Sequence, residues 1–441
     1  MELNRLDAKE AGWNNMEESI AILGAGIAGI AAAYRLKELE IEDAIIYEQE
    51  DTYGGLCNSF EIDGFTFDTF GHISFDPATT KWLEEKTKHF VHEPEALNYD
   101  RGRWLRHPVQ NNLIGLPVEE RIELIKGFVE RKNVEDICNY GQWLKNTYGT
   151  AFSERYPYQY TRKYWTVEPE QLEPKWVKGR MYEPTLEEVL RGAMTAKTPG
   201  VHYSKKANYP LRGGFKAFLR PMAEHCKIRY NKRVYAIDIK GKKITFRDGS
   251  SIFYDKIITT IPLPELCGCI EGIPTELQEA SKKLDYTTGV LVSLGLKRKK
   301  ASPALWFYIY DEDILPARVY APDWKSPYNV PENCSALQAE IYFSTYRPMS
   351  MSQEKLLDDT IKQLLKLELF NQEDIVVKDI RVKKYANIMF TPAIYEAREK
   401  IHKFLDENEI NYAGRFGEWD YLWAGQSLLS GRTAADKCIK R

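Results

Sequence analysis

The sequence predicts an α/β protein in which a discontinuous Rossmann-like dinucleotide-binding domain carries a helical insertion and an antiparallel-sheet substrate domain. Three observations predict this class: a glycine-rich turn between an apolar strand and a helix, a helix-rich stretch, and strand-rich segments further along the chain. The 441 residues also exceed the size at which one core usually stops growing. We expect the dinucleotide domain at 19–77, 205–265 and 405–441, the mainly helical domain at 78–204, and the antiparallel β-sheet substrate domain at 266–404.

The first β-α-β unit carries the strongest signal. Residues 20–23 form an apolar run that leads into Gly24, Gly26 and Gly29. This spacing allows a tight turn, a close approach of the backbone to a pyrophosphate, and close packing of helix on strand. Glu48 ends the next apolar run, where a carboxylate accepts hydrogen bonds from a ribose. The order of strand, glycines, helix, strand and acid therefore predicts a bound dinucleotide.

The remaining elements follow from local patterns. Asp63-Gly64 between alternating residues predicts a tight hairpin. Helical spacing is found at 117–125, 134–148 and 353–369, and the segment at 289–296 reads as a strand. Short strands separated by turns at 228–254, followed by a buried strand that Pro262 ends, indicate that the dinucleotide domain resumes there.

Composition excludes several classes of function. The formal net charge of −3 provides no field for nucleic acid or anionic lipid, so no nucleic-acid binding is expected. No run approaches roughly 18 apolar residues, so no stable membrane insertion is expected. The seven cysteines lack paired metal-ligand spacings, so we predict no metal site and a reduced, cytoplasmic setting. The first 18 residues are polar and resemble no secretory signal. A homo-oligomer is compatible with all of this.

Three runs, at 54–60, 64–68 and 71–75, resemble UDP-galactopyranose mutase and its flavoprotein relatives, the protoporphyrinogen and amine oxidases. The resemblance implies FAD, active in its reduced form in a mutase, with NAD(P)H as a candidate reductant. It implies that His72 lies beside the flavin ring and that Arg415 neutralises the pyrophosphate. The cofactor-binding residues that the glycine pattern and the resemblance predict together are Gly24, Gly26, Gly29, Glu48, Gly54, Gly55, Leu56, Cys57, Val234, Gly414, Arg415, Gln426 and Ser427.

Further segments, around 108–113, 160–180 and 306–329, resemble the eukaryotic-type mutases. The resemblance implies a nucleotide-sugar substrate, and it places Arg180 and Arg318 on the diphosphate as catalytic residues together with His72. It also implies that flavin N5 attacks the anomeric carbon, the nucleoside diphosphate leaves, and the sugar ring recloses at the other size. The substrate-binding residues implied are Gln110, Thr161, Trp165, Arg180, Tyr308, Arg318 and Tyr421.

The residue types suit that chemistry. Guanidinium groups bind paired phosphate oxygens and tyrosines donate without adding charge, so both stabilise a departing diphosphate. Departures from the family pattern are Phe70 before Gly71-His72, Thr161 in the uridine pocket, and Gly425 after Tyr421. We therefore expect a mutase of altered donor specificity.

Other interpretations remain open. The arginines could be ordinary surface residues, the aromatic residues could belong to the core, and His72 could be a turn histidine. The alternative function is an FAD-dependent oxidase or desaturase of the amine oxidase or protoporphyrinogen oxidase type. A third is a flavin-binding protein without turnover, suggested by Phe70.

Overall fold

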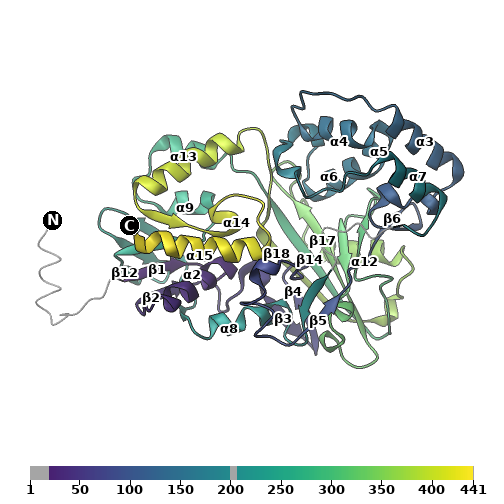
Figure 1. The fold of residues 1–441 in the computed structure, drawn as a ribbon. Helices are drawn as coiled ribbons and strands as arrows, with labels where there is room; N and C mark the ends of the chain where they lie inside the picture. The colour runs from purple at the N-terminus through teal and green to yellow at the C-terminus, as the bar shows by residue number, and fades with distance from the viewer. Residues whose placement is uncertain (1–18, 199–205, 441) are drawn as a thin grey trace, which may run out of the picture. The chain divides into compact units, whose positions relative to one another are not determined.

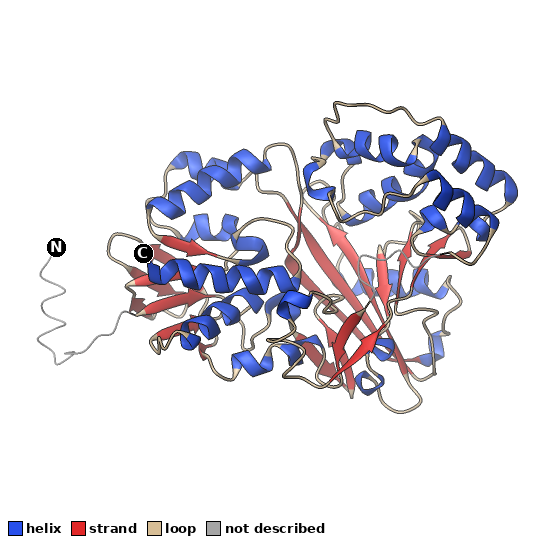
Figure 2. Cartoon of the chain, viewed as in Figure 1, coloured by secondary structure: helices blue, strands red, loops and turns tan. Residues whose placement is uncertain are grey.

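The computed structural model describes residues 19–198 and 206–440, so the polar N-terminal lead-in and the predicted boundary at 204/205 lie outside the described residues. The described residues form two compact units. Unit 1 comprises the described residues up to Gly55, Leu219–Lys282, and those from Ala397 onward. Unit 2 comprises those within Leu56–Phe218 and Lys283–Glu396. Figure 1 and Figure 2 show the helices and strands of both units.

Unit 1 is built on a parallel sheet of five strands in the order β19-β13-β1-β2-β9. The central strand β1 pairs with β2 on one side and with β13 on the other. An antiparallel sheet β10-β11-β12 precedes β13 in the chain. The strands are β1 Ile20–Leu23, β2 Ala44–Tyr47, β9 Lys227–Arg229, β10 Val234–Asp238, β11 Lys243–Phe246, β12 Ser251–Phe253, β13 Lys256–Thr259 and β19 Ile410–Tyr412.

Helices α2 and α15 pack side by side on this parallel sheet (Figure 1). A Cβ added at Gly431 of α15 would lie 2.0 Å from the main-chain oxygen of Ala28, so only glycine permits this approach. The helices of this part are α2 Ile27–Glu38, α8 Arg220–Ala223, α9 Leu263–Cys269, α10 Thr275–Ser281, α13 Ile394–Glu407, α14 Gly414–Gly417 and α15 Ala424–Lys440.

Unit 2 contains a seven-stranded sheet in the order β18-β14-β17-β16-β15-β6-β7, the hairpin β3-β4 and the pair β5-β8. The hairpin turns at Asp63 (φ 48°) and Gly64 (φ 80°), as its sequence predicts. The strands are β3 Ser59–Ile62, β4 Phe65–Asp68, β5 His89–His92, β6 Ala96–Asp100, β7 Arg103–Arg106, β8 Ala207–Pro210, β14 Tyr286–Leu296, β15 Trp306–Ile309, β16 Arg318–Tyr320, β17 Ser335–Phe343 and β18 Ile375–Ile388.

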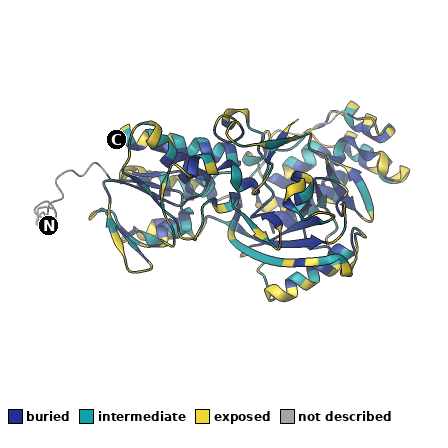
Figure 3. Ribbon diagram, turned by 90° about the horizontal axis from the view of Figure 1, so that it is seen from below, coloured by how far each residue is buried: buried dark blue, intermediate teal, exposed yellow. Residues whose placement is uncertain are grey.

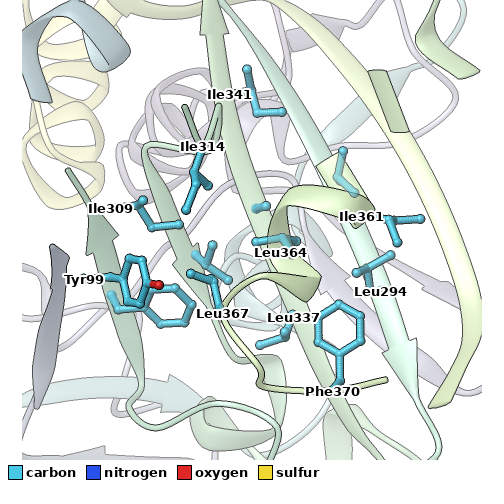
Figure 4. Packing of buried hydrophobic residues seen from close by; sticks show 14 of the residues in the cluster. Tyr99, Leu294, Ile309, Ile314, Leu337, Ile341, Ile361, Leu364, Leu367 and Phe370 are labelled. Carbon is cyan, nitrogen blue, oxygen red and sulfur yellow. The ribbon is translucent and has the colours of Figure 1, made fainter. Parts of the chain in front are cut away.

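The core of unit 2 lies between the large sheet and α12, where Leu294, Leu337 and Ile341 pack against Ile361 and Leu364 (Figure 4). Figure 3 shows dark blue, buried residues along the strands and yellow, exposed residues on helix surfaces and loops. The helices of unit 2 are α3 Val118–Val129, α4 Tyr140–Tyr148, α5 Thr150–Ser153, α6 Gln159–Tyr164, α7 Leu186–Met194, α11 Pro322–Lys325 and α12 Gln353–Leu365.

The predicted α/β class is confirmed. The stretch at 78–204, expected to be mainly helical, also supplies β6 and β7 to the large sheet. The strands within 266–404 pair antiparallel with one another, and β6 joins β15 in parallel. The helical spacing at 134–148 yields a helix only at Tyr140–Tyr148, which begins where the Asn139 side chain accepts a hydrogen bond from Gln142 N. No helix of the described residues is long and apolar enough to cross a membrane.

Candidate functional site

The glycine-rich turn joins β1 to α2. Gly24 adopts φ 101°, and a Cβ at Gly29 would lie 1.9 Å from the main-chain oxygen of Gly24. The fold of the protein itself therefore requires glycine at both positions. Gly26 differs, because a Cβ placed there would meet no protein atom within 4 Å. Open space in front of Gly26 is what a pyrophosphate lying against the backbone requires.

The start of α2 fits an anion. Its N-cap residue Gly26 has no side chain to cap the first amides of the helix, and the first turn holds no acidic residue. A second glycine pair, Gly54-Gly55, lies beside this helix start. Gly54 N donates to the oxygen of Ala25 at 2.8 Å, and Gly55 (φ 57°) lies against the Cα of Gly26. Backbone amides at a helix start, approached by glycines, form a cradle for a diphosphate. The residues present therefore fit the pyrophosphate of FAD.

Glu48 follows β2 and is nearly buried. Its two carboxylate oxygens accept hydrogen bonds from Ala25 N (2.6 Å) and Glu50 N (3.0 Å). Burial raises the pKa of Glu48, and these amides oppose the rise. The carboxylate is thereby held beside the glycine-rich turn, and its predicted contact with a ribose stays a prediction.

The C-terminal segment supplies the other predicted cofactor residues of unit 1. Gly414 (φ 78°) opens α14, where a Cβ would lie 2.8 Å from the Cβ of Ala28 in α2. Arg415 Nε donates to the oxygen of Leu422 at 2.8 Å, and its guanidinium lies 5.4 Å from the ring centre of Tyr421. Gln426 accepts a hydrogen bond from Trp423 N, and Ser427 lies buried in α15. Val234, the first residue of β10, is also buried.

The predicted substrate residues lie mostly in unit 2, where Arg318 occupies a fixed position. In the β16-β17 register Arg318 stands opposite Glu340. Its Nε and Nη2 donate to Glu340 Oε2 at 2.9 and 2.7 Å. The Arg318 side chain is 23% exposed, whereas that of Glu340 is 0% exposed. One end of the guanidinium is therefore anchored while part of the side chain remains accessible.

Glu340 was not predicted from the sequence, yet it connects most of this region. Besides Arg318, it accepts hydrogen bonds from Tyr342 OH (2.6 Å), Tyr320 OH (3.1 Å) and Gly71 N (3.2 Å). Burial disfavours its charge, but the Arg318 charge and these donors outweigh burial and lower the pKa of Glu340. The only sequence signal is an acid in the middle of an otherwise uncharged strand, 335–343.

Tyrosine rings surround the Arg318 end of the sheet. Tyr308 pairs with Arg318 across β15 and β16, and Tyr160 of α6 meets the Tyr308 ring edge-on at 5.5 Å. Tyr160 also stacks on Tyr164, which packs against Tyr342 at 4.6 Å. The structure thus brings the predicted Tyr308 and Arg318 together with additional tyrosines that sequence reasoning missed.

The Phe70-Gly71-His72 segment is tied to the same sheet. Phe70 is buried and stacks on Tyr342, and a Cβ at Gly289 of β14 would lie 2.4 Å from the Phe70 ring. Gly289 therefore makes the space that the Phe70 ring occupies. His72 Nδ1 lies 3.0 Å from the oxygen of Phe70, and its ring packs 5.2 Å from that of Phe215.

The other predicted residues of unit 2 take varied positions. Trp165 is 3% exposed within an aromatic cluster with Tyr164 and Trp176, and Thr161 is 1% exposed in α6. Gln110 and Tyr148 line the same small cavity among the helices. The remaining three residues are Arg180, half-buried in the loop before α7, and Leu56 and Cys57 in the 3₁₀ turn at Gly55–Cys57.

The chain belongs to the flavin containing amine oxidoreductase family, whose model matches residues 27–439. Its structure is similar over 97% of its length to the crystal structure of reduced UDP-galactopyranose mutase, covering 94% of that chain with a TM-score of 0.90 and 27% identity. A fatty acid isomerase from P. acnes that produces CLA shares the fold, with a TM-score of 0.65, 14% identity, and coverage of 96% and 98% of the two chains.

Curated relatives match over short stretches. A 4,4'-diapophytoene desaturase of Staphylococcus haemolyticus (strain JCSC1435) is 40% identical over 72 residues, which is 16% of this chain and 14% of the relative. A zeta-carotene-forming phytoene desaturase of Myxococcus xanthus is 43% identical over 49 residues, 11% of this chain and 9% of the relative. The chain therefore matches only a small part of these desaturases.

Proposed function

We propose that the protein is a flavin-dependent mutase that interconverts the pyranose and furanose forms of a nucleoside-diphosphate hexose. The observation that carries the proposal is the Arg318 guanidinium, held by Glu340 beside Tyr308 and Tyr160. The likeness to reduced UDP-galactopyranose mutase over nearly the whole chain supports it.

In this proposal Arg318 and the phenols of Tyr308 and Tyr160 stabilise the diphosphate as it gains charge on leaving the sugar. Arg180 binds the same diphosphate from the loop before α7. Gly24, Gly26, Gly54 and the start of α2 hold FAD through its pyrophosphate. Reduced FAD, when bound, supplies the nucleophile for the anomeric carbon, and NAD(P)H is the proposed reductant.

In this proposal Glu340 orients the Arg318 guanidinium and the Gly71-His72 loop relative to each other. Because one carboxylate oxygen bonds Arg318 and the other bonds Gly71 N, it relates the diphosphate-binding guanidinium to the loop that carries His72. Reaction between a bound sugar and a bound cofactor depends on such positioning. Buried Thr161 and Gly425 stand where the family has asparagines, which supports a donor that differs from UDP-galactose.

The test is to reduce the purified holoprotein with dithionite under anaerobic conditions and offer UDP-, dTDP- and GDP-hexopyranoses, with chromatography and NMR to detect furanose products. Arg318→Ala should lower nucleotide affinity by at least about tenfold and leave the FAD content intact. Arg381→Ala provides the matched control, because Arg381 is an ion-paired arginine elsewhere in the same sheet. Absence of product and of nucleotide binding across the panel would sink the proposal.

The second candidate is an FAD-dependent desaturase or oxidase, favoured by the short matches to carotenoid desaturases. Such an enzyme transfers a hydride to oxidised FAD and has no use for a diphosphate at Arg318. Oxidised holoprotein incubated with a polyene or an amine should then bleach its flavin absorbance. Bleaching without any response to nucleotide sugars would favour this function over the mutase.

A further inference from the structure

Asp68, the last residue of β4, carries a buried charge. One of its carboxylate oxygens accepts hydrogen bonds from Ser59 Oγ (2.7 Å) and Phe215 N (2.9 Å). The other accepts hydrogen bonds from Tyr209 OH (2.9 Å) and Lys325 Nζ (2.9 Å). Burial disfavours the Asp68 charge, but Lys325 and the other donors outweigh burial and lower the pKa of this carboxyl. Asp68 is therefore an ionised side chain with both oxygens hydrogen-bonded.

Lys325 of α11 is an equally buried cation. Its side chain is 3% exposed and that of Asp68 is 2% exposed, so the pair is shielded from water. The ammonium also lies 4.5 Å from the ring centre of Tyr320 and 5.2 Å from that of Tyr209. The backbone at this residue is anchored, because the Lys325 oxygen lies 2.8 Å from His92 Nε2. Lys325 therefore holds Asp68 from a fixed position.

The loop that follows β4 is tied to the same side chains. Gly71 lies on the Tyr320 ring, since a Cβ added there would be 2.7 Å from a ring carbon. The Gly71 amide donates to Glu340 Oε1, and Tyr320 OH donates to the same oxygen. Tyr320 thus lies between two buried ion pairs, with Lys325 at its ring and Glu340 at its hydroxyl. The loop that leads to His72 is held at its start by one pair and further along by the other.

We propose that Asp68 and Lys325 are positioning residues that fix the loop carrying His72 beside the flavin ring. The inference rests on the proposed function, in which His72 has that place. A buried ion pair adds little net stability over apolar side chains of similar size, so stability alone does not account for this one. An ion pair closed by further hydrogen bonds does impose one geometry on the segments that it joins. Such positioning affects the rate of reaction at a bound cofactor.

Amide hydrogen exchange of the full-length holoprotein measures how firmly the loop is held, with mass spectrometry of a peptide that covers 69–75. Lys325→Met removes the cation and should speed exchange in this peptide by about tenfold or more. Arg155→Met is the matched control, because Arg155 is a largely buried arginine of unit 2 that pairs with buried Asp100 at 2.6 Å. It breaks a comparable ion pair, so exchange at 69–75 should stay within about twofold of wild type.

A double variant separates positioning from stability. Lys325→Met alone leaves the Asp68 charge buried and unpaired, which destabilises the whole protein. Asp68→Asn, Lys325→Met removes both charges and keeps an oxygen that accepts from Ser59 and Phe215. Urea unfolding of the double variant should therefore recover most of the lost stability. Exchange at 69–75 should remain raised, because the connection to α11 is still missing.

Two measurements report on the cofactor. The visible circular dichroism of bound FAD depends on the surroundings of the flavin ring, and it should change in the single and the double variant at equal FAD content. In the reduced enzyme both variants should lose about tenfold or more in kcat, while KM for the nucleotide sugar stays within about threefold of wild type. Exchange and dichroism do not depend on turnover, so they decide this inference even if the mutase assay fails.

Three outcomes overturn the positioning role. The first is wild-type exchange at 69–75 in Lys325→Met. The second is an equal rise of that exchange in Arg155→Met, which would make the effect one of general stability. The third is a double variant whose exchange and flavin dichroism both match those of wild type.

Discussion

Glu340→Gln tests whether the carboxylate organises the Arg318 region. The substitution keeps the shape of the side chain but removes a buried charge that receives hydrogen bonds from Arg318, Tyr342, Tyr320 and Gly71. Removing one partner of a buried ion pair costs about 3–5 kcal/mol. Because the Arg318 side chain is 23% exposed and regains some hydration, we expect a loss of about 2–3 kcal/mol in the free energy of unfolding.

Urea unfolding followed by intrinsic fluorescence measures that loss, with Glu187→Gln as control. Glu187 pairs with Arg191 on the surface of α7 and should cost less than about 0.5 kcal/mol. The double variant Arg318→Met, Glu340→Leu removes both charges but leaves Tyr320 OH, Tyr342 OH and Gly71 N without their acceptor, so it should regain only part of the stability while nucleotide binding stays weak. An unfolding free energy for Glu340→Gln within about 0.5 kcal/mol of wild type would refute the reasoning, because a buried carboxylate with these partners cannot be lost at so small a cost.

Of three other predictions, two concern glycine positions and the third concerns a buried lysine. Gly26→Ala should leave the stability near that of wild type but lower the FAD affinity at least about tenfold. Gly29→Ala should instead destabilise the apoprotein, because its Cβ would meet the backbone. Flavin absorbance measures the first outcome and thermal unfolding the second. Gly289→Ala should cost about 1–3 kcal/mol by overpacking the Phe70 ring, and Phe70→Leu in the same chain should recover part of it; equal stability of wild type and Gly289→Ala would contradict the packing. Burial lowers the pKa of Lys163 to about 7 from 10.5, so between these pH values the unfolded chain binds more protons and stability rises with pH, by up to about 1.4 kcal/mol per unit. Urea midpoints measured across that window should rise less in Lys163→Met than in wild type, and parallel curves would argue against a buried, titrating Lys163.

Local patterns determined what could be predicted from the sequence. The turn at Gly24 and the hairpin at Asp63-Gly64 depend on neighbouring residues and were predicted correctly in kind and place. The pairing of β6 with β15 was not predicted, because the residues of a strand do not indicate which distant strand it pairs with. Glu340 was missed for the same reason, since its donors Arg318 and Gly71 are 22 and 269 positions away in the chain.

The site residues show the same limit. A family pattern can place Trp165 and Thr161 in a nucleotide pocket, but only packing shows that both side chains are buried, at 3% and 1% exposure. For Phe70, the sequence could indicate a bulky ring near the flavin. It could not indicate that Gly289, far along the chain, provides the space for that ring.

The parallel sheet of unit 1 has a consequence for the order in which the chain folds during synthesis. Ile20 pairs with Lys256, and Ile257 pairs with Ile410, so β1 and β2 leave the ribosome long before β13 and β19 exist. Helix α15, which covers α2, is made later still. Contacts of such high sequence separation form late. The glycine-rich turn between β1 and α2 is thus translated long before the strands and the helix that complete its surroundings, and a nascent chain has to keep its apolar β1 and β2 strands from misassociating in the meantime.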